Sequence, residues 1–314
     1  FGADGEPRIA YLGGGDDGSV YWKQSDLALA TRSGGAWSSV TLARNGGEAA
    51  SGFETSDFGV VVGLWPALAL TDGGELFVAY RDVHGGQFPT DYQHSDLEVV
   101  EGSPGSLRRS VAVLGANTLE GHGGMTSVTL AGGRPALAWS TQPGSQNDTP
   151  RGVWFARRGG DGGWGAPEKL AGPSDTRAGP SLSWREGLGF GVAFEDAGSG
   201  LLNYLESADG DTWAPAEPVH GDGTGGWYPA LAFGPDGEPA IAYYVCSLSA
   251  AASECKPDDD ALLLKRRRAG IWPARALTVD SDGAWWPRLA WAGARAAIAY
   301  KDPGCTVLKL AVQR

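Results

Sequence analysis

Several features are scarce in this 314-residue chain, and each scarcity excludes a class of protein. No apolar run approaches the roughly 18 residues of a membrane-spanning helix, so we predict no membrane span. Lys and Arg number 25 against 37 Asp and Glu, and the formal charge of −12 argues against a nucleic-acid partner, which needs a basic face. Apolar residues at helical spacing are absent throughout, which argues against an α-helical fold.

Glycine and tryptophan are abundant instead, with 50 and 13 residues. This composition suits many short strands joined by Gly-rich turns, with aromatic rings between the sheets. The stretch 225–244, GGWYPALAFGPDGEPAIAYY, shows the pattern most clearly. Two runs of alternating small and large apolar residues flank a Gly-Pro-Asp-Gly turn, which predicts a strand–turn–strand unit.

Variants of this stretch recur about every 50 to 60 residues, which indicates a repeat architecture. Each copy continues with a third strand, a tight turn carrying Gly and Trp, and a short fourth strand; in the first copy we place the third strand at Ser19–Tyr21. Four antiparallel strands per repeat are typical of a β-propeller. We therefore predict an all-β, six-bladed propeller forming a single domain over 1–314, with repeats at about 1–44, 60–115, 121–171, 178–217, 225–277 and 283–314.

The two terminal blades are expected to be incomplete. Phe1 aligns with the last residue of a first strand, and the final repeat stops after its third strand. Because an open blade would expose a sheet edge, we expect a segment that precedes Phe1 to supply the missing strands.

One turn resembles a known family. Residues 207–213, SADGDTW, are similar to the Asp-box (BNR repeat) of sialidase-like propellers, Ser-x-Asp-x-Gly-x-Thr-Trp, with one residue deleted. In that family the box is structural, which implies that it holds the turn between the third and fourth strands, away from the catalytic face. The arginine triad, Tyr–Glu pair and acid of the sialidase active site have no matching motifs here, so the resemblance does not imply sialidase activity.

Strand order sorts the loops onto two faces, and all four histidines fall on one of them. His84 and His94 belong to a long loop between second and third strands, while His122 and His220 precede first strands. Neutral imidazoles are common transition-metal ligands, so these residues are candidates for a metal site. The alternative is that long loops simply hold more polar residues. Asp258–Asp260 and Asp16–Asp17 lie on the same face and are candidates for Ca²⁺ binding or, more simply, solvated acids.

The same face carries an aromatic collar. Aligning the first strands gives one equivalent position to Trp65, Met125, Tyr228 and Trp286, and Trp227 and Trp285 precede two of them. Such rings can seal one blade against the next. They can also form an apolar mouth that stacks on a sugar, an aromatic group or a cation.

An aspartate that follows another charged residue ends the second strand of alternate repeats. The pairs are Arg81-Asp82, Glu195-Asp196 and Lys301-Asp302. Asp82, Asp196 and Asp302, with Arg81 and Glu195, are therefore candidate catalytic groups or cation ligands. The competing interpretation is that the aspartates cap strand ends through local hydrogen bonds.

Three cysteines bear on the cellular compartment. Cys246 and Cys255 are spaced for a local disulfide, but Cys305 lies in the corresponding loop of the next repeat, so the pairing stays open. We predict a secreted protein, extracellular or periplasmic, that binds an extracellular glycan or other small molecule at the collar face. The alternatives are a metal-assisted hydrolase or lyase that uses the His and Asp residues, with a transition metal or Ca²⁺ as cofactor, and a scaffold for a protein partner.

Overall fold

A computed structural model of the chain describes residues 5–14, 25–46, 59, 61–85, 94–103, 105–115, 121–141, 152–172, 179–196, 199–221, 223–249, 255, 257–304 and 307–313. The residues group into two compact units, Phe1–Lys169 and Leu170–Arg314. Each unit is built from successive antiparallel sheets in which strands adjacent in sequence are adjacent in the sheet.

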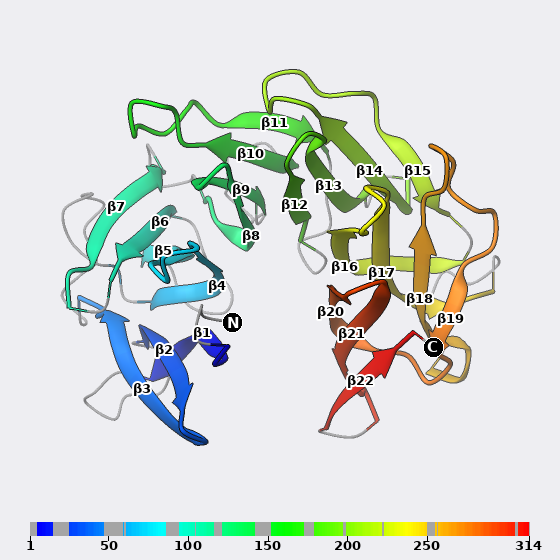
Figure 1. Ribbon diagram of the computed structural model, residues 1–314, viewed down its shortest axis with the longest axis horizontal. Helices are drawn as coiled ribbons and strands as arrows, with labels where there is room; N and C mark the ends of the chain where they lie inside the picture. Colours follow the sequence, from blue (N-terminus) through cyan, green and yellow to red (C-terminus); the bar gives the residue numbers. More distant parts are fainter. Residues whose placement is uncertain are drawn as a thin grey trace. The chain divides into compact units, whose positions relative to one another are not determined.

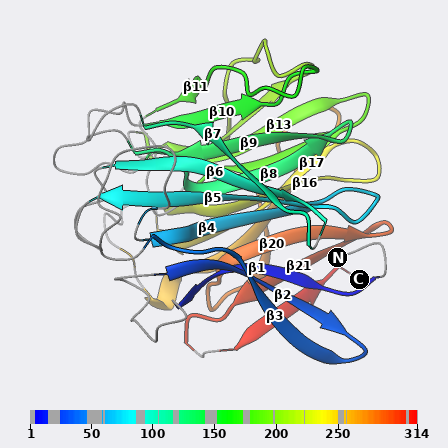
Figure 2. The same cartoon turned by 90° about the vertical axis from the view of Figure 1, so that its left-hand side faces the viewer.

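The first unit contains a seven-stranded sheet, which divides into a three-stranded and a four-stranded part, and a further four-stranded sheet (Figure 1). The three-stranded part is formed by β1 (Arg8–Gly14), β2 (Ser25–Ser33) and β3 (Ala36–Ala43). A single parallel bridge between Ser25 and Val61 joins it to the four-stranded part. That part comprises β4 (Val61–Leu70), β5 (Leu76–Gly85), β6 (His94–Gly102) and β7 (Arg108–Val113), and Figure 2 shows β4, β5 and β6 side by side. The further sheet comprises β8 (Gly124–Ala131), β9 (Arg134–Ser140), β10 (Val153–Arg157) and β11 (Glu168–Ala171).

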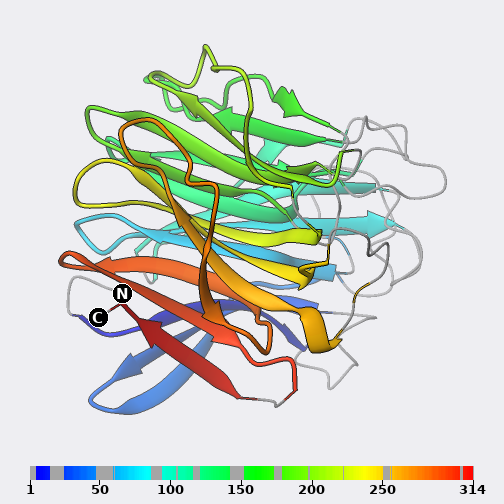
Figure 3. The same cartoon turned by 90° about the vertical axis from the view of Figure 1, so that its right-hand side faces the viewer.

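The second unit contains three sheets. The first comprises β12 (Ser181–Arg185), β13 (Gly189–Asp196), β14 (Leu201–Ser207) and β15 (Glu217–His220). The second comprises β16 (Thr224–Phe233), β17 (Pro239–Ser247), β18 (Ala261–Arg266) and β19 (Leu277–Asp280), with the short 3-10 helix η1 (Pro257–Asp259) before β18. The last has three strands, β20 (Trp285–Ala292), β21 (Arg295–Lys301) and β22 (Leu308–Val312), drawn orange to red in Figure 3.

The core of the second unit lies between neighbouring sheets, and β17 shows why the sequence alternates as it does. Ile241, Tyr243 and Val245 belong to the apolar cluster shared with the preceding sheet. Ala240 and Ala242 belong to the cluster shared with the following sheet. Because side chains alternate across a strand, one face offers large side chains and the other small ones. This strand is buried on both faces, so adjacent sheets pack closely.

The structure confirms an all-β chain with four-stranded antiparallel blades, four of which are complete in the described residues. First strands of successive sheets contact one another within each unit, as in a propeller. The placement of the first repeat's third strand was wrong: β2 occupies Ser25–Ser33, and Ser19–Tyr21 lies outside the described residues. Within the described part of the chain, no helix is long and apolar enough to cross a membrane.

Candidate functional site

The four aligned collar residues share an uncommon backbone conformation. Trp65, Met125, Tyr228 and Trp286 have φ angles of 50°, 45°, 52° and 51°. A left-handed conformation costs an L-residue about 1–2 kcal/mol, so bulky side chains rarely adopt it. At each of these positions the pairing of the first strand with the second shifts in register, which marks a β-bulge. The same irregularity therefore recurs in four sheets and points to a constraint on where these side chains lie.

In three of the four sheets a glycine two residues earlier brings the bulged strand close to the preceding sheet, and Ala284 stands at this place before Trp286. A Cβ on Gly63 would lie 2.7 Å from the Leu27 Cα, and one on Gly226 would lie 2.9 Å from the Leu202 Cβ. A larger residue at Gly63 or Gly226 would therefore push these sheets apart. The glycine and the bulge together fix where the collar side chain leaves the strand.

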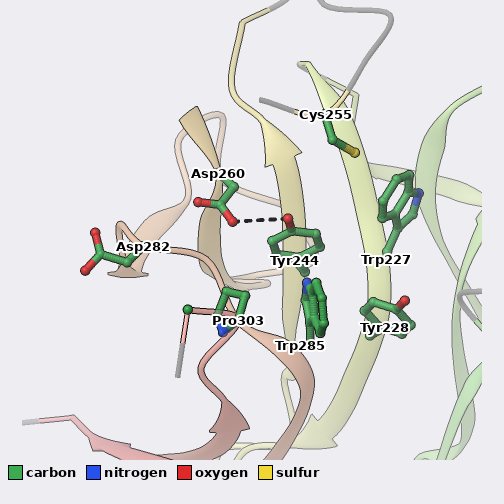
Figure 4. A pocket seen from close by; sticks show the side chains of 9 residues that line it. Trp227, Tyr228, Tyr244, Cys255, Asp260, Asp282, Trp285 and Pro303 are labelled. Carbon is green, nitrogen blue, oxygen red and sulfur yellow. Dashed lines mark hydrogen bonds between the residues drawn. The ribbon is translucent and has the colours of Figure 1, made fainter. Parts of the chain in front are cut away.

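One pocket opens at this end of the second unit, between the sheet of β16–β19 and that of β20–β22. Its volume is about 560 Å³. Aromatic, acidic and small residues form its wall, namely Trp227, Tyr228, Tyr244, Cys255, Asp260, Asp282, Trp285, Pro303 and Gly304. Three predicted ligand-binding residues, Trp227, Tyr228 and Trp285, thus lie around one cavity (Figure 4). Trp286 stands beside them, half-exposed, with its ring centroid 5.6 Å from that of Tyr228.

A tyrosine–carboxylate pair lies in this wall. The Tyr244 hydroxyl donates a hydrogen bond to Asp260 Oδ2 at 3.1 Å (Figure 4). Burial, followed by the charge of Asp260, raises the pKa of Tyr244 to about 12. Burial, with repulsion from Asp282 and Asp280, also raises the pKa of Asp260 above its ordinary value. Both groups therefore hold their protons more tightly than they would in water.

Asp260 occupies a position that serves a structural purpose elsewhere. By strand register it corresponds to Ser25 and Ser95, each of which lies at the start of a third strand. The hydroxyls of these serines donate to the carbonyls of Val62 and His122, three residues before a collar position of the next sheet. At Asp260 a carboxylate replaces the hydroxyl. A carboxyl group of the pocket wall therefore stands where two other repeats have a serine hydroxyl that links one sheet to the next.

The residue before each predicted aspartate meets the aromatic rings. The Arg81 guanidinium lies 5.5 Å from the Trp65 ring centroid, and Glu195 Oε1 accepts a hydrogen bond of 2.8 Å from the Trp227 indole. The Lys301 ammonium lies 5.2 Å from the Trp285 ring centroid and 5.3 Å from that of Trp286. Cation–π and hydrogen-bond contacts of this kind fix the orientation of the collar rings.

The aspartates themselves make hydrogen bonds and, in two cases, ion pairs, which join Asp82 to Arg109 at 3.4 Å and Asp302 to Lys309 at 2.7 Å. Asp82, fully buried, accepts a hydrogen bond from the Gly59 amide at 2.9 Å. Asp196 accepts one from the Ser199 hydroxyl at 3.0 Å, and Asp302 accepts one from the Gly304 amide at 2.8 Å. The short-range hydrogen bonds of Asp196 and Asp302 are those expected of strand-end capping, whereas Asp82 is held by residues distant in the sequence. A catalytic role for the three residues stays a prediction.

The two histidines whose side chains are described pack against aromatic rings. His122 is buried beside Trp139 and Trp154, with ring centroids 6.1 and 6.2 Å away, and His220 is packed 5.1 Å from Tyr243. The side chains of His84 and His94 lie outside the described part of the structure, as do Asp16 and Asp17. Among the residues that are described, no three His, Cys, Asp or Glu side chains come together as metal ligands do. The metal site therefore stays a prediction.

Near the pocket, the open cysteine pairing is resolved in part. Cys246 and Cys255 form a disulfide, with Cα atoms 4.8 Å apart, while Cys305 lies outside the described residues. The disulfide joins the buried end of β17 to the loop ahead of β18. Asp259 holds the same loop by accepting hydrogen bonds from the Ser247 hydroxyl and the Ser249 amide. The wall that carries Asp260 is thus fixed both covalently and by hydrogen bonds.

The Asp-box-like turn between β14 and β15 has a structural geometry. Asp209 Oδ1 accepts hydrogen bonds from the Asp211 and Thr212 amides at 2.9 and 3.0 Å, which lower the pKa of this carboxyl. The Ser207 hydroxyl accepts one from the Gly210 amide at 2.8 Å. The turn lies at the end of the blade opposite to the loops that carry the pocket.

Sequence reasoning did not single out Tyr244, Asp282 or Asp260 as a binding group. Asp260 was grouped with two other acids as a candidate calcium ligand or solvated charge, although its relative exposure is only 6%. The available signal was positional. Asp260 directly precedes a third strand, where two other repeats have serine.

Comparison with solved structures places the fold. No protein-family model matches the sequence, and no curated protein sequence is significantly similar to it. The structure resembles Trypanosoma rangeli sialidase, solved in complex with sialic acid, with a TM-score of 0.53 and 11% identity over 97% of this chain and 53% of that one. It also resembles the Hadza microbial sialidase Hz136, with a TM-score of 0.54 and 11% identity over 98% and 65%.

This likeness defines the class of fold. The chain has a β-propeller fold of the kind seen in sialidases. It spans about half the length of the trypanosomal enzyme. Identity this low carries the fold and not the activity.

Proposed function

We propose that this protein is a secreted, six-bladed β-propeller, folded as a single domain, that binds a saccharide in the pocket beside Trp227, Tyr228 and Trp285. The observation that carries the proposal is the pocket itself, where aromatic faces and carboxylates converge. Sugar rings stack on aromatic faces, and carboxylates accept hydrogen bonds from sugar hydroxyls. A pocket of about 560 Å³ is in the size range of small-ligand sites.

Two further observations support the extracellular setting and the ligand class. The Cys246–Cys255 disulfide is typical of an oxidising compartment. The solved structures with similar folds include sialidases, one in complex with sialic acid. Among the described lining residues there is no arginine or lysine to pair with a sugar carboxylate. The carboxyl groups of Asp260 and Asp282 in the wall would repel an acidic sugar, so the proposed ligand is a neutral or basic one.

The test is a glycan-binding measurement with ring-removal variants. Trp285→Ala and Trp227→Ala remove stacking surfaces, and each is expected to weaken binding by about tenfold or more, since a stacked ring contributes about 1–3 kcal/mol. Trp37→Ala removes an exposed tryptophan that does not line the pocket and serves as the matched control. Saccharide binding that survives loss of both pocket rings would place the site elsewhere.

Hydrolysis is a second candidate function, favoured by one observation. The pocket wall contains two carboxyl groups, Asp260 and Asp282, and burial raises the pKa of the first. Glycosidases use one protonated and one ionised carboxyl group. Turnover of aryl glycosides that is lost in both Asp260→Asn and Asp282→Asn would support this candidate. Binding without turnover would refute it.

A further inference from the structure

The wall of the pocket is acidic as well as aromatic. Asp260 and Asp282 contribute carboxylates, and the described lining residues include no cationic side chain. The rings of Trp227, Tyr228, Tyr244 and Trp285 also line the pocket, and the face of each π system is its negative side. Carboxylates and ring faces both attract a cation, and each attraction strengthens when the cation is partly removed from water.

Asp260 has an acceptor that no described residue satisfies. Its Oδ2 accepts the Tyr244 hydrogen bond, but its Oδ1 is buried with no hydrogen-bond partner among the described residues. The residue as a whole is only 6% exposed. A buried carboxylate oxygen without a partner is costly to maintain. A positive charge bound in the pocket would offset that cost.

The molecule already contains one contact of this kind at the rim of the pocket. The Lys301 ammonium lies 5.2 and 5.3 Å from the ring centroids of Trp285 and Trp286. These distances are within the roughly 6 Å range of a favourable cation–π contact. The contact shows that an ammonium group is held against collar rings in this molecule, and Lys301 itself takes that place on Trp285 and Trp286.

We propose that the pocket binds its ligand through an ammonium group, held against the aromatic faces and balanced by the carboxylates of Asp260 and Asp282. The inference rests on the proposed function, because it concerns the same pocket and specifies the saccharide as an amino sugar with a free amine. Quaternary ammonium compounds such as choline carry the same chemistry, so the experiment has to separate the two sources.

The experiment is isothermal titration calorimetry with three probes: a glucosamine oligosaccharide, its N-acetylated counterpart of equal length, and choline. The pH is set so that the amine is protonated. The free amine is expected to bind about tenfold or more tightly than the acetylated sugar, because acetylation removes the charge. Raising the salt concentration weakens only the charged ligands.

Two charge variants locate the effect. Asp260→Asn keeps the side-chain size and is expected to weaken binding of the amine about tenfold or more. Asp282→Asn, at an exposed position, gives the second test without disturbing the core. Asp258→Asn makes the same charge change at an exposed position that does not line the pocket, and is expected to leave the affinity within about twofold.

Each outcome decides something. Equal binding of free and acetylated sugars, lost in Trp285→Ala, overturns the ammonium proposal and leaves saccharide binding intact. Choline binding that depends on Asp260, without any saccharide binding, supports the ammonium proposal and contradicts the saccharide. Unchanged amine affinity in both Asp260→Asn and Asp282→Asn overturns the ammonium proposal. No binding of any probe contradicts both proposals.

Discussion

Gly283 offers a direct test of how tightly the pocket wall is built. This residue has a φ of +72°, and a Cβ added to it would lie 2.0 Å from Asp260 Oδ2 and 3.0 Å from Tyr244 Cε2. Replacing Gly283 with Ala therefore has two effects. It places an L-side chain in a left-handed conformation, and it forces the Asp260 carboxylate to move.

The two effects have different magnitudes and a control that separates them. The left-handed conformation costs about 1–2 kcal/mol. The overlap, and the loss of the Tyr244 hydrogen bond when Asp260 moves, adds about 1–3 kcal/mol. Gly293 has a φ of +61° and nothing within 4 Å of its added Cβ, so Gly293→Ala should show only the first cost.

The assay is urea unfolding followed by tryptophan fluorescence. Gly283→Ala is expected to lower the free energy of unfolding by about 2–5 kcal/mol, and Gly293→Ala by about 1–2 kcal/mol. In an Asp260→Ala background the carboxylate is gone and the Tyr244 Cε2 contact at 3.0 Å remains, so the cost of Gly283→Ala should fall toward that of Gly293→Ala. Equal costs for the two alanines in the unaltered protein would refute the proposed packing of Asp260 against Gly283.

Three further predictions follow from other parts of the structure. Ala269 and Gly270 form a two-residue turn with φ angles of 49° and 76°, so Ala269→Asn should raise the unfolding free energy by about 0.5–1 kcal/mol in the same urea assay. Asp209→Ala should lower the thermal unfolding midpoint at neutral pH. Because the folded-state pKa of Asp209 is depressed, this difference should vanish as the pH falls through that pKa. The absorbance of Tyr244 should titrate near pH 12, and because the unfolded state loses this proton near 10.0, stability should fall as the pH rises between these values. A Tyr244→Phe variant that keeps the same alkaline stability loss would contradict the last prediction.

Much of the blade framework could be predicted because its signals are local. In β17 the alternation of Ala240, Ile241 and Ala242 encodes both a strand and its burial on two faces. The first repeat shows the limit of this reasoning. Its third strand was placed too early, because an apolar stretch at Ser19–Tyr21 satisfies the same pattern as β2. Local alternation indicates where strands can form, but it does not determine which of two candidate segments pairs with the neighbouring strand β1.

The sequence predicted the aromatic residues of the candidate site but not the residues that surround them. The collar positions were found because aligned repeats place Tyr228 and Trp286 at the same point in the strand. The partners of these rings come from other strands, and their identities depend on pairing register and on which way a residue faces. Asp260 faces Tyr244 while the adjacent Asp259 holds the loop, and an acidic run alone does not separate these roles.

The recurrent bulge has a consequence for how such a molecule can diversify. Its conformation is held by a nearby glycine and by regular pairing on both sides, and it accommodates tryptophan, tyrosine and methionine alike. The identity of the collar residue is thus separable from the folding of its blade. Repertoires built by randomising Trp65, Met125, Tyr228 and Trp286 together would vary the chemistry of the mouth over a constant scaffold, much as antibody loops vary over a constant sandwich.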